Sequence, residues 1–292
     1  MRTDGDTWDI VSSVGATALG VATFRAIETA RPDAMIRDDY ARLFVEAADD
    51  PNFLETLDDP PAIGPLPRMI GLRTRFFDEF FDAATATGIR QAVIVAAGLD
   101  ARAYRLPWPA GATLFEIDQP KVLEFKQQVL TDRQVTPRVA RCAVPVDLRD
   151  DWPAALADAG FDPALPTAWS AEGLLPYLPG AAQDSLFERI DALSAPGSRV
   201  SVECFTGRPD IARFSAVEQS LFDRSPFGDL DVAALFYDDD RADPAQWFAG
   251  RGWSVRSAGV AELAARFDQP VPELPAEAAE MAALSAYLTA RK

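Results

Sequence analysis

The sequence contains no histidine, and this absence excludes several kinds of chemistry. A Ser-His-Asp or Cys-His catalytic device and a His-ligated metal site all need an imidazole. Only two cysteines are present, Cys142 and Cys204, and their wide spacing excludes a cysteine-rich zinc module. Such a low cysteine content is typical of a reducing compartment. Acid–base chemistry in this protein must therefore use carboxylates or other side chains.

Long hydrophobic runs and positive charge are also scarce. The stretch Met1–Asp9 is polar and acidic, and no later segment approaches the length of a membrane span, so we expect a cytoplasmic protein with no membrane partner. The chain has 45 acidic and 28 basic residues, a formal net charge of −17. Because this field repels polyphosphate backbones, we expect a small-molecule partner and no nucleic acid. The sequence does not indicate an oligomeric state.

The composition is that of a globular protein, with 48% hydrophobic and 25% charged residues among 292. Helices are predicted at 14–30, 38–48 and 69–85, whereas prolines and acids predict an irregular stretch at 49–67. The helix at 69–85 carries a stripe of phenylalanines, which we interpret as core packing. Residues 1–90 are therefore predicted to form an N-terminal helical cap that contributes to the functional site.

Short apolar runs separated by helical segments begin at Gln91, a pattern typical of a mostly parallel sheet with helices on both faces. Strands are predicted at 91–96, 113–117, 140–146, 167–172, 198–205, 252–258 and 284–290. Helices are predicted at 120–131, 151–159, 181–194, 211–223, 244–250 and 260–267. The predicted fold is an α/β, Rossmann-like doubly wound core over 91–292. An insertion near 206–246 is expected to be irregular at 226–231 and 237–240. The core and the N-terminal cap are expected to form one compact unit.

Ligands of an open parallel sheet bind outside the carboxyl ends of its strands. After the first predicted strand come Ala96, Ala97 and Gly98, whose minimal side chains let the backbone approach a ligand. Asp118 follows the second strand, 20 residues after Gly98, where a carboxylate can accept hydrogen bonds from both hydroxyls of a ribose. These residues predict a nucleoside site.

The next two strand ends extend this set. Asp147 and Leu148 follow the third strand and suit the amino group and ring face of adenine, although Asp147 taken alone is better interpreted as a helix cap or a solvated loop residue. Glu172 follows the fourth strand. The four ends together favour an adenosine-like ligand more than any one of them does.

The first loop has one glycine where the dinucleotide fingerprint Gly-x-Gly-x-x-Gly has three. A nucleoside without phosphates, such as S-adenosylmethionine, therefore fits better than a dinucleotide. Arg25 and Arg73 are candidate cations for its methionine carboxylate, although each could also be a surface arginine. Asp100 and Arg102 could form a local ion pair.

The ordered motifs resemble those of bacterial, largely actinobacterial, S-adenosylmethionine-dependent methyltransferases related to leucine carboxyl methyltransferases, over nearly the whole chain. The motifs are Ser13–Leu19, Arg25–Glu28, Arg73–Asp78, Ala96–Leu106, Glu116–Pro120, Pro145–Arg149 and Glu172–Leu178. The resemblance implies the class I methyltransferase fold, a sheet of seven strands whose last strand is antiparallel.

The resemblance also implies a set of cofactor contacts. The residues are Arg25, Arg73, Ala96, Gly98, Asp118, Asp147, Leu148 and Glu172. In this assignment Arg73 holds the methionine carboxylate with help from Arg25, and Glu172 lies near the methionine amino group. Asp118 binds the ribose hydroxyls, and Asp147 with the Leu148 backbone binds adenine.

Methyl transfer from a sulfonium is an in-line displacement that needs alignment and a water-poor site and no metal. A carboxylate acceptor is already a nucleophile, whereas a hydroxyl acceptor would use a base, for which Glu172, Tyr177 or another carboxylate is the candidate. Tyr177 is equally well interpreted as a buried ring. We interpret Cys204 as a packed thiol. Aromatic residues near the insertion predict an apolar acceptor pocket: Phe205, Phe214, Phe222, Phe227, Phe236 and Tyr237.

We therefore expect methyl transfer to a carboxylate or hydroxyl oxygen of a small, partly apolar molecule. Two alternatives stay open. A Rossmann-type NAD(P)-dependent oxidoreductase shares the fold and the ribose-binding acid but would need the missing glycines. A non-catalytic S-adenosylmethionine-binding protein would keep every residue discussed.

Overall fold

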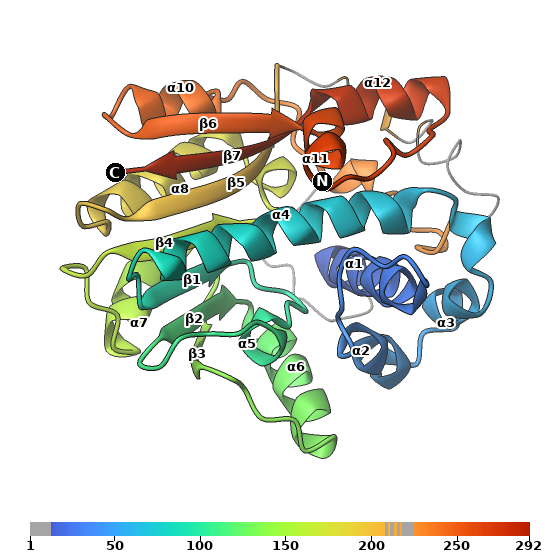
Figure 1. The fold of residues 1–292 in the computed structure, drawn as a ribbon, viewed down its shortest axis with the longest axis horizontal. Coiled ribbons are helices and arrows are strands. Elements are labelled where there is room, and N and C mark those ends of the chain that lie inside the picture. Colours follow the sequence, from blue (N-terminus) through green and yellow to red (C-terminus); the bar gives the residue numbers. More distant parts are fainter. Residues whose placement is uncertain (1–12, 208–209, 211–212, 215–216, 218–224) are drawn as a thin grey trace.

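A seven-stranded sheet forms the centre of the computed structural model, in the order β3-β2-β1-β4-β5-β7-β6 (Figure 1). The structure describes residues 13–292 except 208–209, 211–212, 215–216 and 218–224. The strands are β1 (Gln91–Val95), β2 (Thr113–Asp118), β3 (Ala140–Pro145), β4 (Thr167–Ala171), β5 (Arg199–Phe205), β6 (Ser254–Gly259) and β7 (Ser285–Arg291). The first five run parallel, and β7 is antiparallel to both of its neighbours. The predicted strands and the antiparallel last strand are confirmed.

The central strands are apolar because both of their faces are covered by helices. Along β1, Ala92 and Ile94 pack into one hydrophobic cluster while Val93 and Val95 pack into another on the opposite face. A strand that is buried on both faces has a continuous apolar sequence. The bounds of β1 could therefore be predicted closely from the sequence.

Helices cover both faces of the sheet. On one face lie α4 (Leu66–Ala86), α5 (Arg102–Arg105), α6 (Pro120–Asp132) and α11 (Val260–Arg266), with α1 (Ser13–Ala30), α2 (Ala41–Ala48) and α3 (Pro51–Asp58) packed outside them. On the other face lie α7 (Trp152–Asp158), α8 (Gly180–Ala192) and α10 (Pro244–Ala249). The helix α12 (Ala276–Leu284) leads directly into β7. Figure 1 shows α4 crossing the front of the sheet, with α1 packed against it and drawn below its right-hand part.

The phenylalanine stripe of α4 is core packing, as the sequence predicted. Phe80 and Phe81 join a cluster shared with α1, α2 and the sheet, while Phe76 and Phe77 pack with α11 and Tyr287. Burial of each of these rings contributes roughly 1.5–3 kcal/mol. The stripe therefore attaches the N-terminal helices to the sheet.

The prediction of an irregular stretch over 49–67 is wrong. The helix α3 occupies Pro51–Asp58, and a 3₁₀ helix follows at Pro60–Ile63. Asp50 caps α3, because its carboxylate accepts hydrogen bonds from the backbone N–H groups of Asn52 (2.9 Å) and Phe53 (3.4 Å). Pro51 stands at the first helical position, where proline favours initiation and does not break a helix.

Other boundaries also differ from the sequence prediction. The helix predicted over 38–48 begins at Ala41, because the Asp38 side chain accepts from the backbone N–H groups of Tyr40 and Ala41. The helix α12 was not predicted. The helix predicted at 211–223 lies largely outside the described residues.

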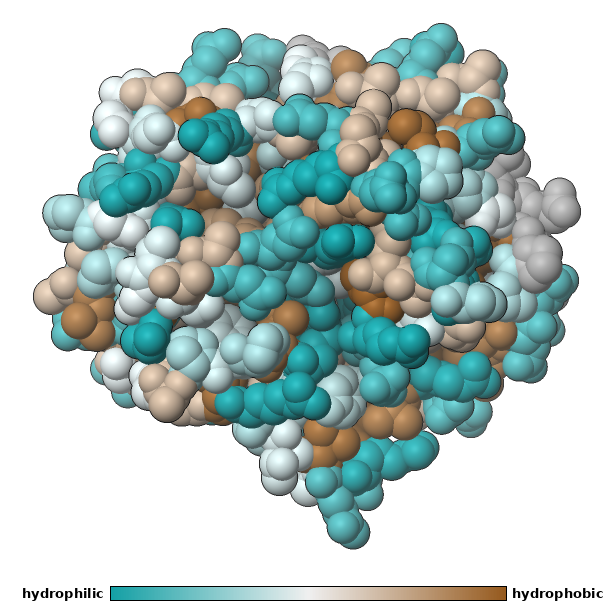
Figure 2. Space-filling model, viewed as in Figure 1, coloured by the Kyte–Doolittle hydropathy of each residue, from teal (hydrophilic) through white to brown (hydrophobic). Residues whose placement is uncertain are grey.

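In the part of the chain that the structure describes, no helix combines the length and apolar character needed to cross a bilayer. On the face shown in Figure 2, hydrophobic residues are scattered among hydrophilic ones and form no single broad patch.

Candidate active site

A cavity of about 810 Å³ opens at the carboxyl ends of the parallel strands. It is bounded by the loops after β1 to β5, by α1 and α4, and by residues near the insertion and α12. Every residue predicted as a cofactor contact or a catalytic base lines it: Arg25, Arg73, Ala96, Gly98, Asp118, Asp147, Leu148, Glu172 and Tyr177. The fold thus brings together residues spread over more than half of the chain.

The loop after β1 has an unusual backbone. Ala96 (φ 54°) and Gly98 (φ 47°) both lie in the left-handed region. A non-glycine residue there costs about 1–2 kcal/mol, so the surrounding contacts must hold Ala96 in place. The N–H of Ala97 donates to the carbonyl of Ile117 (3.0 Å) and that of Gly98 to Asp118 Oδ2 (2.6 Å). The loop is therefore tied to the end of β2.

Asp118 is a half-buried carboxylate at the cavity wall, and backbone donors stabilise its charge. Its Oδ2 accepts from Gly98 N–H and its Oδ1 from Gln119 N–H, both at 2.6 Å. Burial raises the pKa of Asp118 to about 6, and the two backbone hydrogen bonds limit this rise. Each oxygen keeps a further lone pair, so the group can accept the two hydroxyl donors of a ribose.

Asp147 has a different environment. Its Oδ2 accepts from Gln119 Nε2 (2.5 Å) and Arg149 Nη2 (2.6 Å), and its Oδ1 from Arg149 N–H (2.8 Å). Although burial acts to raise it, hydrogen bonds from Arg149 and Gln119 lower the pKa of Asp147 to about 2. This carboxylate is therefore ionised at neutral pH. The cap of α7 is Asp151 and not Asp147, so the helix-cap interpretation of Asp147 is wrong.

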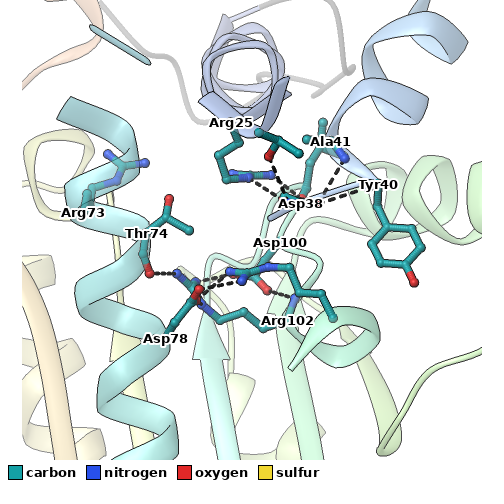
Figure 3. Close-up of polar contacts among 12 residues, drawn as sticks. Arg25, Asp38, Tyr40, Ala41, Arg73, Thr74, Asp78, Asp100 and Arg102 are labelled. Atoms are coloured by element: carbon teal, nitrogen blue, oxygen red, sulfur yellow. Dashed lines mark hydrogen bonds and ion pairs between the residues drawn. The ribbon is translucent and has the colours of Figure 1, made fainter. Parts of the chain in front are cut away.

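Arg102 is the most heavily bonded side chain beside the cavity, and only 2% of it is exposed. Its Nε donates to Asp78 Oδ1 (2.7 Å) and its Nη1 to Glu172 Oε2 (2.8 Å). It also pairs with Asp100, as the sequence suggested, and donates to the carbonyl of Thr74 (3.2 Å). Figure 3 shows Arg102 reaching from the loop after β1 to α4. The network joins α4 to the ends of β1 and β4.

Arg25 is buried and holds the loop after β1 in place. Its Nε pairs with Asp38 Oδ2 (2.8 Å), and its Nη2 donates to the carbonyl of Leu99 (2.7 Å) (Figure 3). Since Asp38 also caps α2, Arg25 joins α1, α2 and the loop. These contacts indicate that Arg25 positions the loop beside the cavity.

Arg73 lies between two carboxylates. Its Nε donates to Glu172 Oε1 (2.9 Å) and its Nη1 to Glu203 Oε2 (3.2 Å). Burial alone would lower the pKa of Arg73, but these two carboxylates raise it above the ordinary arginine value. Both oxygens of Glu172 are thus bonded to guanidinium groups, one to Arg73 and one to Arg102.

Sequence reasoning missed Glu203 and Tyr287. Glu203 lies in β5 opposite Tyr287 of β7, and its Oε2 also accepts from Gly173 N–H (2.7 Å). Burial raises the pKa of Glu203 and that of Tyr287. An acid near the end of the fifth strand repeats the pattern of Asp118 and Asp147, so the sequence held a clue to Glu203.

The aromatic residues divide between the cavity and the core. Phe205, Phe214, Phe236 and Tyr237 line the cavity. Phe227 does not, because it packs against Phe53 in the helical core with ring centroids 5.8 Å apart. Placing Phe227 in the acceptor pocket was therefore wrong, and Phe222 lies outside the described residues.

Two further cavity residues were singled out by the sequence. The ring of Tyr177 contacts Phe236 edge to face, with centroids 5.0 Å apart, so Tyr177 forms part of the apolar wall. Cys204 is half-buried, and burial raises the pKa of its thiol to about 12, which suits the predicted packed thiol.

The strand order, the antiparallel β7 and a cavity beside the carboxylate that ends β2 define the class I methyltransferase fold. The family model for leucine carboxyl methyltransferase matches residues 18–191, and the chain belongs to this family. A Rhodococcus jostii protein is 63% identical over 294 residues and a Mycobacteroides abscessus protein is 56% identical over 294 residues. The alignments cover 100% of both chains in the first case, and 99% of this chain and 96% of the relative in the second. Both relatives bear the name "Putative S-adenosyl-L-methionine-dependent methyltransferase".

Two solved structures share the fold at low sequence identity. A Thermobifida fusca protein titled as a methyltransferase has a TM-score of 0.53 at 17% identity, covering 93% of this chain and 94% of its own. A DUF574 family protein of Streptomyces avermitilis has a TM-score of 0.53 at 16% identity. The match covers 93% of this chain and 96% of the Streptomyces chain. The family resemblance and the fold predicted from the sequence are confirmed.

We predict that Arg102→Met lowers the free energy of unfolding by about 3–5 kcal/mol, because buried carboxylates lose their counter-charge. Urea unfolding at neutral pH measures the change. The matched control is Arg42→Met, which removes an exposed pair with Glu46 on α2 and should cost no more than about 0.5 kcal/mol. Equal losses in the two variants would show that the Arg102 network does not stabilise the fold.

Proposed function

We propose that this protein transfers the methyl group of S-adenosyl-L-methionine to a carboxylate or hydroxyl oxygen of a small, partly apolar molecule. The observation that carries the proposal is one continuous cavity with two chemically distinct parts. One part has the half-buried Asp118 carboxylate beside the glycine loop, and the other has the apolar wall of Phe214 and Phe236. A donor and an acceptor can therefore meet inside a single enclosure.

The residues present fit this cofactor. Asp118 offers a half-buried acceptor for the ribose hydroxyls. Asp147 and Leu148 line the same cavity, and we expect them to contact adenine. Arg73 and Glu172 form an opposite-charge pair that matches the carboxylate and ammonium groups of methionine. The bound cofactor would supply an electrophilic methyl group on a sulfonium. Arg25 supports this region through the Leu99 carbonyl.

The protein's own contribution is to align the groups and keep water out. A carboxylate acceptor needs no base. For a hydroxyl acceptor, Glu172 and Tyr177 are the bases predicted from the sequence, and the geometry adds Glu203. Both Glu172 oxygens accept from arginines, whereas Glu203 Oε1 accepts no hydrogen bond from the described residues. Glu203 is therefore the better-placed proton acceptor.

We predict that the affinity for S-adenosylhomocysteine falls as the pH drops below about 6. Hydroxyl donors favour the ionised form of Asp118, whose pKa is about 6 in the free protein, so binding must displace a proton at lower pH. Titration calorimetry between pH 5 and 8, a range chosen to bracket that pKa, should show up to about a tenfold loss per pH unit below it.

Asp118→Asn should bind more weakly at pH 8 and lose this pH dependence. An exposed-site control, Arg37→Gln, should keep the wild-type profile. A pH profile that Asp118→Asn leaves unchanged would remove Asp118 from the ribose site.

Labelled-methyl transfer tests the reaction itself. We predict that incubation with methyl-labelled S-adenosylmethionine and a cell extract labels a small molecule, and that Asp118→Ala abolishes the labelling. Alkali releases the label from a methyl ester as volatile methanol but leaves a methyl ether intact. This treatment therefore separates a carboxylate acceptor from a hydroxyl acceptor. If the product is an ether, Glu203→Gln should lower kcat by about 10²-fold or more, while the variant still binds S-adenosylhomocysteine.

Two outcomes would contradict the proposal. Tight NAD binding without S-adenosylhomocysteine binding would favour the oxidoreductase alternative. S-adenosylhomocysteine binding with no labelled product in any extract would favour the non-catalytic binding protein.

A further inference from the structure

A second cavity, of about 550 Å³, lies on the α4 side of the sheet over β5, β7 and β6. Strand register explains which side chains form its floor. Arg199 of β5 pairs with Arg291 of β7, which pairs with Ser254 of β6. Two residues along, Thr289 pairs with Arg256 on the same face of the sheet. We call this cavity the arginine groove.

The arginine groove concentrates positive charge in an acidic protein. Four arginines line it, against two glutamates: Arg199, Arg256, Arg266 and Arg291 with Glu79 and Glu262. Arg266 pairs with Glu79. Within the described part of the chain, no carboxylate lies within ion-pair distance of the other three arginines. Like charges directly across a strand pair are destabilising, so Arg199 and Arg291 face each other at a cost.

Arg199 shows the excess of unpaired positive charge in the arginine groove most clearly. Its Nη1 donates to the carbonyl of Ala83 on α4 (3.2 Å), but its Nε is buried with no hydrogen-bond partner among the described residues. Burial and the charge of Arg291 both lower the pKa of Arg199. An anion beside Arg199 and Arg291 would satisfy the unpaired donor and relieve the repulsion.

The groove also offers hydroxyl groups. Ser254 and Thr289 line it, on the same face of the sheet as Arg256 and Arg291. Forked guanidinium donors and hydroxyls form the donor set that suits a phosphoryl group, because its oxygens accept several hydrogen bonds and its charge can exceed one. Tyr287 lies at the boundary, since it lines both this groove and the larger cavity.

We propose that the arginine groove binds the phosphoryl group of a small phosphorylated molecule, at a site separate from the methyl-transfer cavity. Figure 1 shows β6 and β7 beside α4 on the face where this groove lies. The inference does not depend on the identity of the methyl acceptor or on methyl transfer.

The test is titration calorimetry of the full-length protein with inorganic phosphate and with glycerol 2-phosphate, at constant ionic strength set by chloride. Both should bind saturably, and the affinity should persist when S-adenosylhomocysteine is saturating. The double variant Arg256→Gln/Arg291→Gln should bind at least tenfold more weakly. The charge-matched control Arg37→Gln/Arg42→Gln, which removes two exposed positive charges outside the groove, should bind as the wild type does. Binding of inorganic phosphate but not of glycerol 2-phosphate would restrict the site to a free anion and overturn the proposal.

A second measurement separates a binding role from a structural one. In phosphate-free buffer, Arg291→Gln should leave the melting temperature unchanged or raise it, because it removes a repulsion. Added phosphate should raise the melting temperature of the wild type more than that of the variant. The proposal is overturned if neither phosphate compound binds beyond the effect of chloride. It is also overturned if the double variant binds as the wild type does, or if S-adenosylhomocysteine abolishes the binding.

Discussion

The burial of Arg102 among carboxylates from three parts of the chain is the constraint on which the active-site geometry depends. Asp78 comes from α4, Asp100 from the loop after β1, and Glu172 from the end of β4. A buried guanidinium is tolerated only when its donors are paired, so these segments must meet at one point. The N-terminal helices are thereby fixed relative to the sheet edge that binds the ligand.

The pairing of arginines with carboxylates continues across the cavity, so that positive and negative side chains alternate. Glu172 bridges Arg102 and Arg73, and Arg73 in turn contacts Glu203. A cofactor carboxylate arriving at Arg73 would compete with the two glutamates for one guanidinium group. Because Glu203 makes the longer contact, at 3.2 Å against 2.9 Å for Glu172, it is the partner more easily displaced. Cofactor binding and the availability of a base would then be coupled through one arginine.

Much of the fold and part of the site could be predicted from the sequence. Apolar runs revealed the strands because both sheet faces are buried, and parallel topology then placed Asp118 and Asp147 at one edge. The helix α3 was missed because Pro51 stands at its first position. A rule that treats proline only as a helix breaker does not predict a helix that begins with proline. Local patterns also could not show that Arg25 meets Asp38, or that Arg102 meets Asp78, since these contacts join distant elements. Glu203 was overlooked although its position repeats the pattern of the other strand-end acids.

Hydrogen exchange of the backbone, measured with and without S-adenosylhomocysteine, tests the central claim most directly. The account predicts slower exchange at the strand-end segments 96–100, 118–119, 147–149 and 172–174, where the cavity is lined by loop backbone. The groove floor at 254–257 should change little. Protection confined to other parts of the chain, or the absence of any ligand-dependent protection in these four segments, would contradict it.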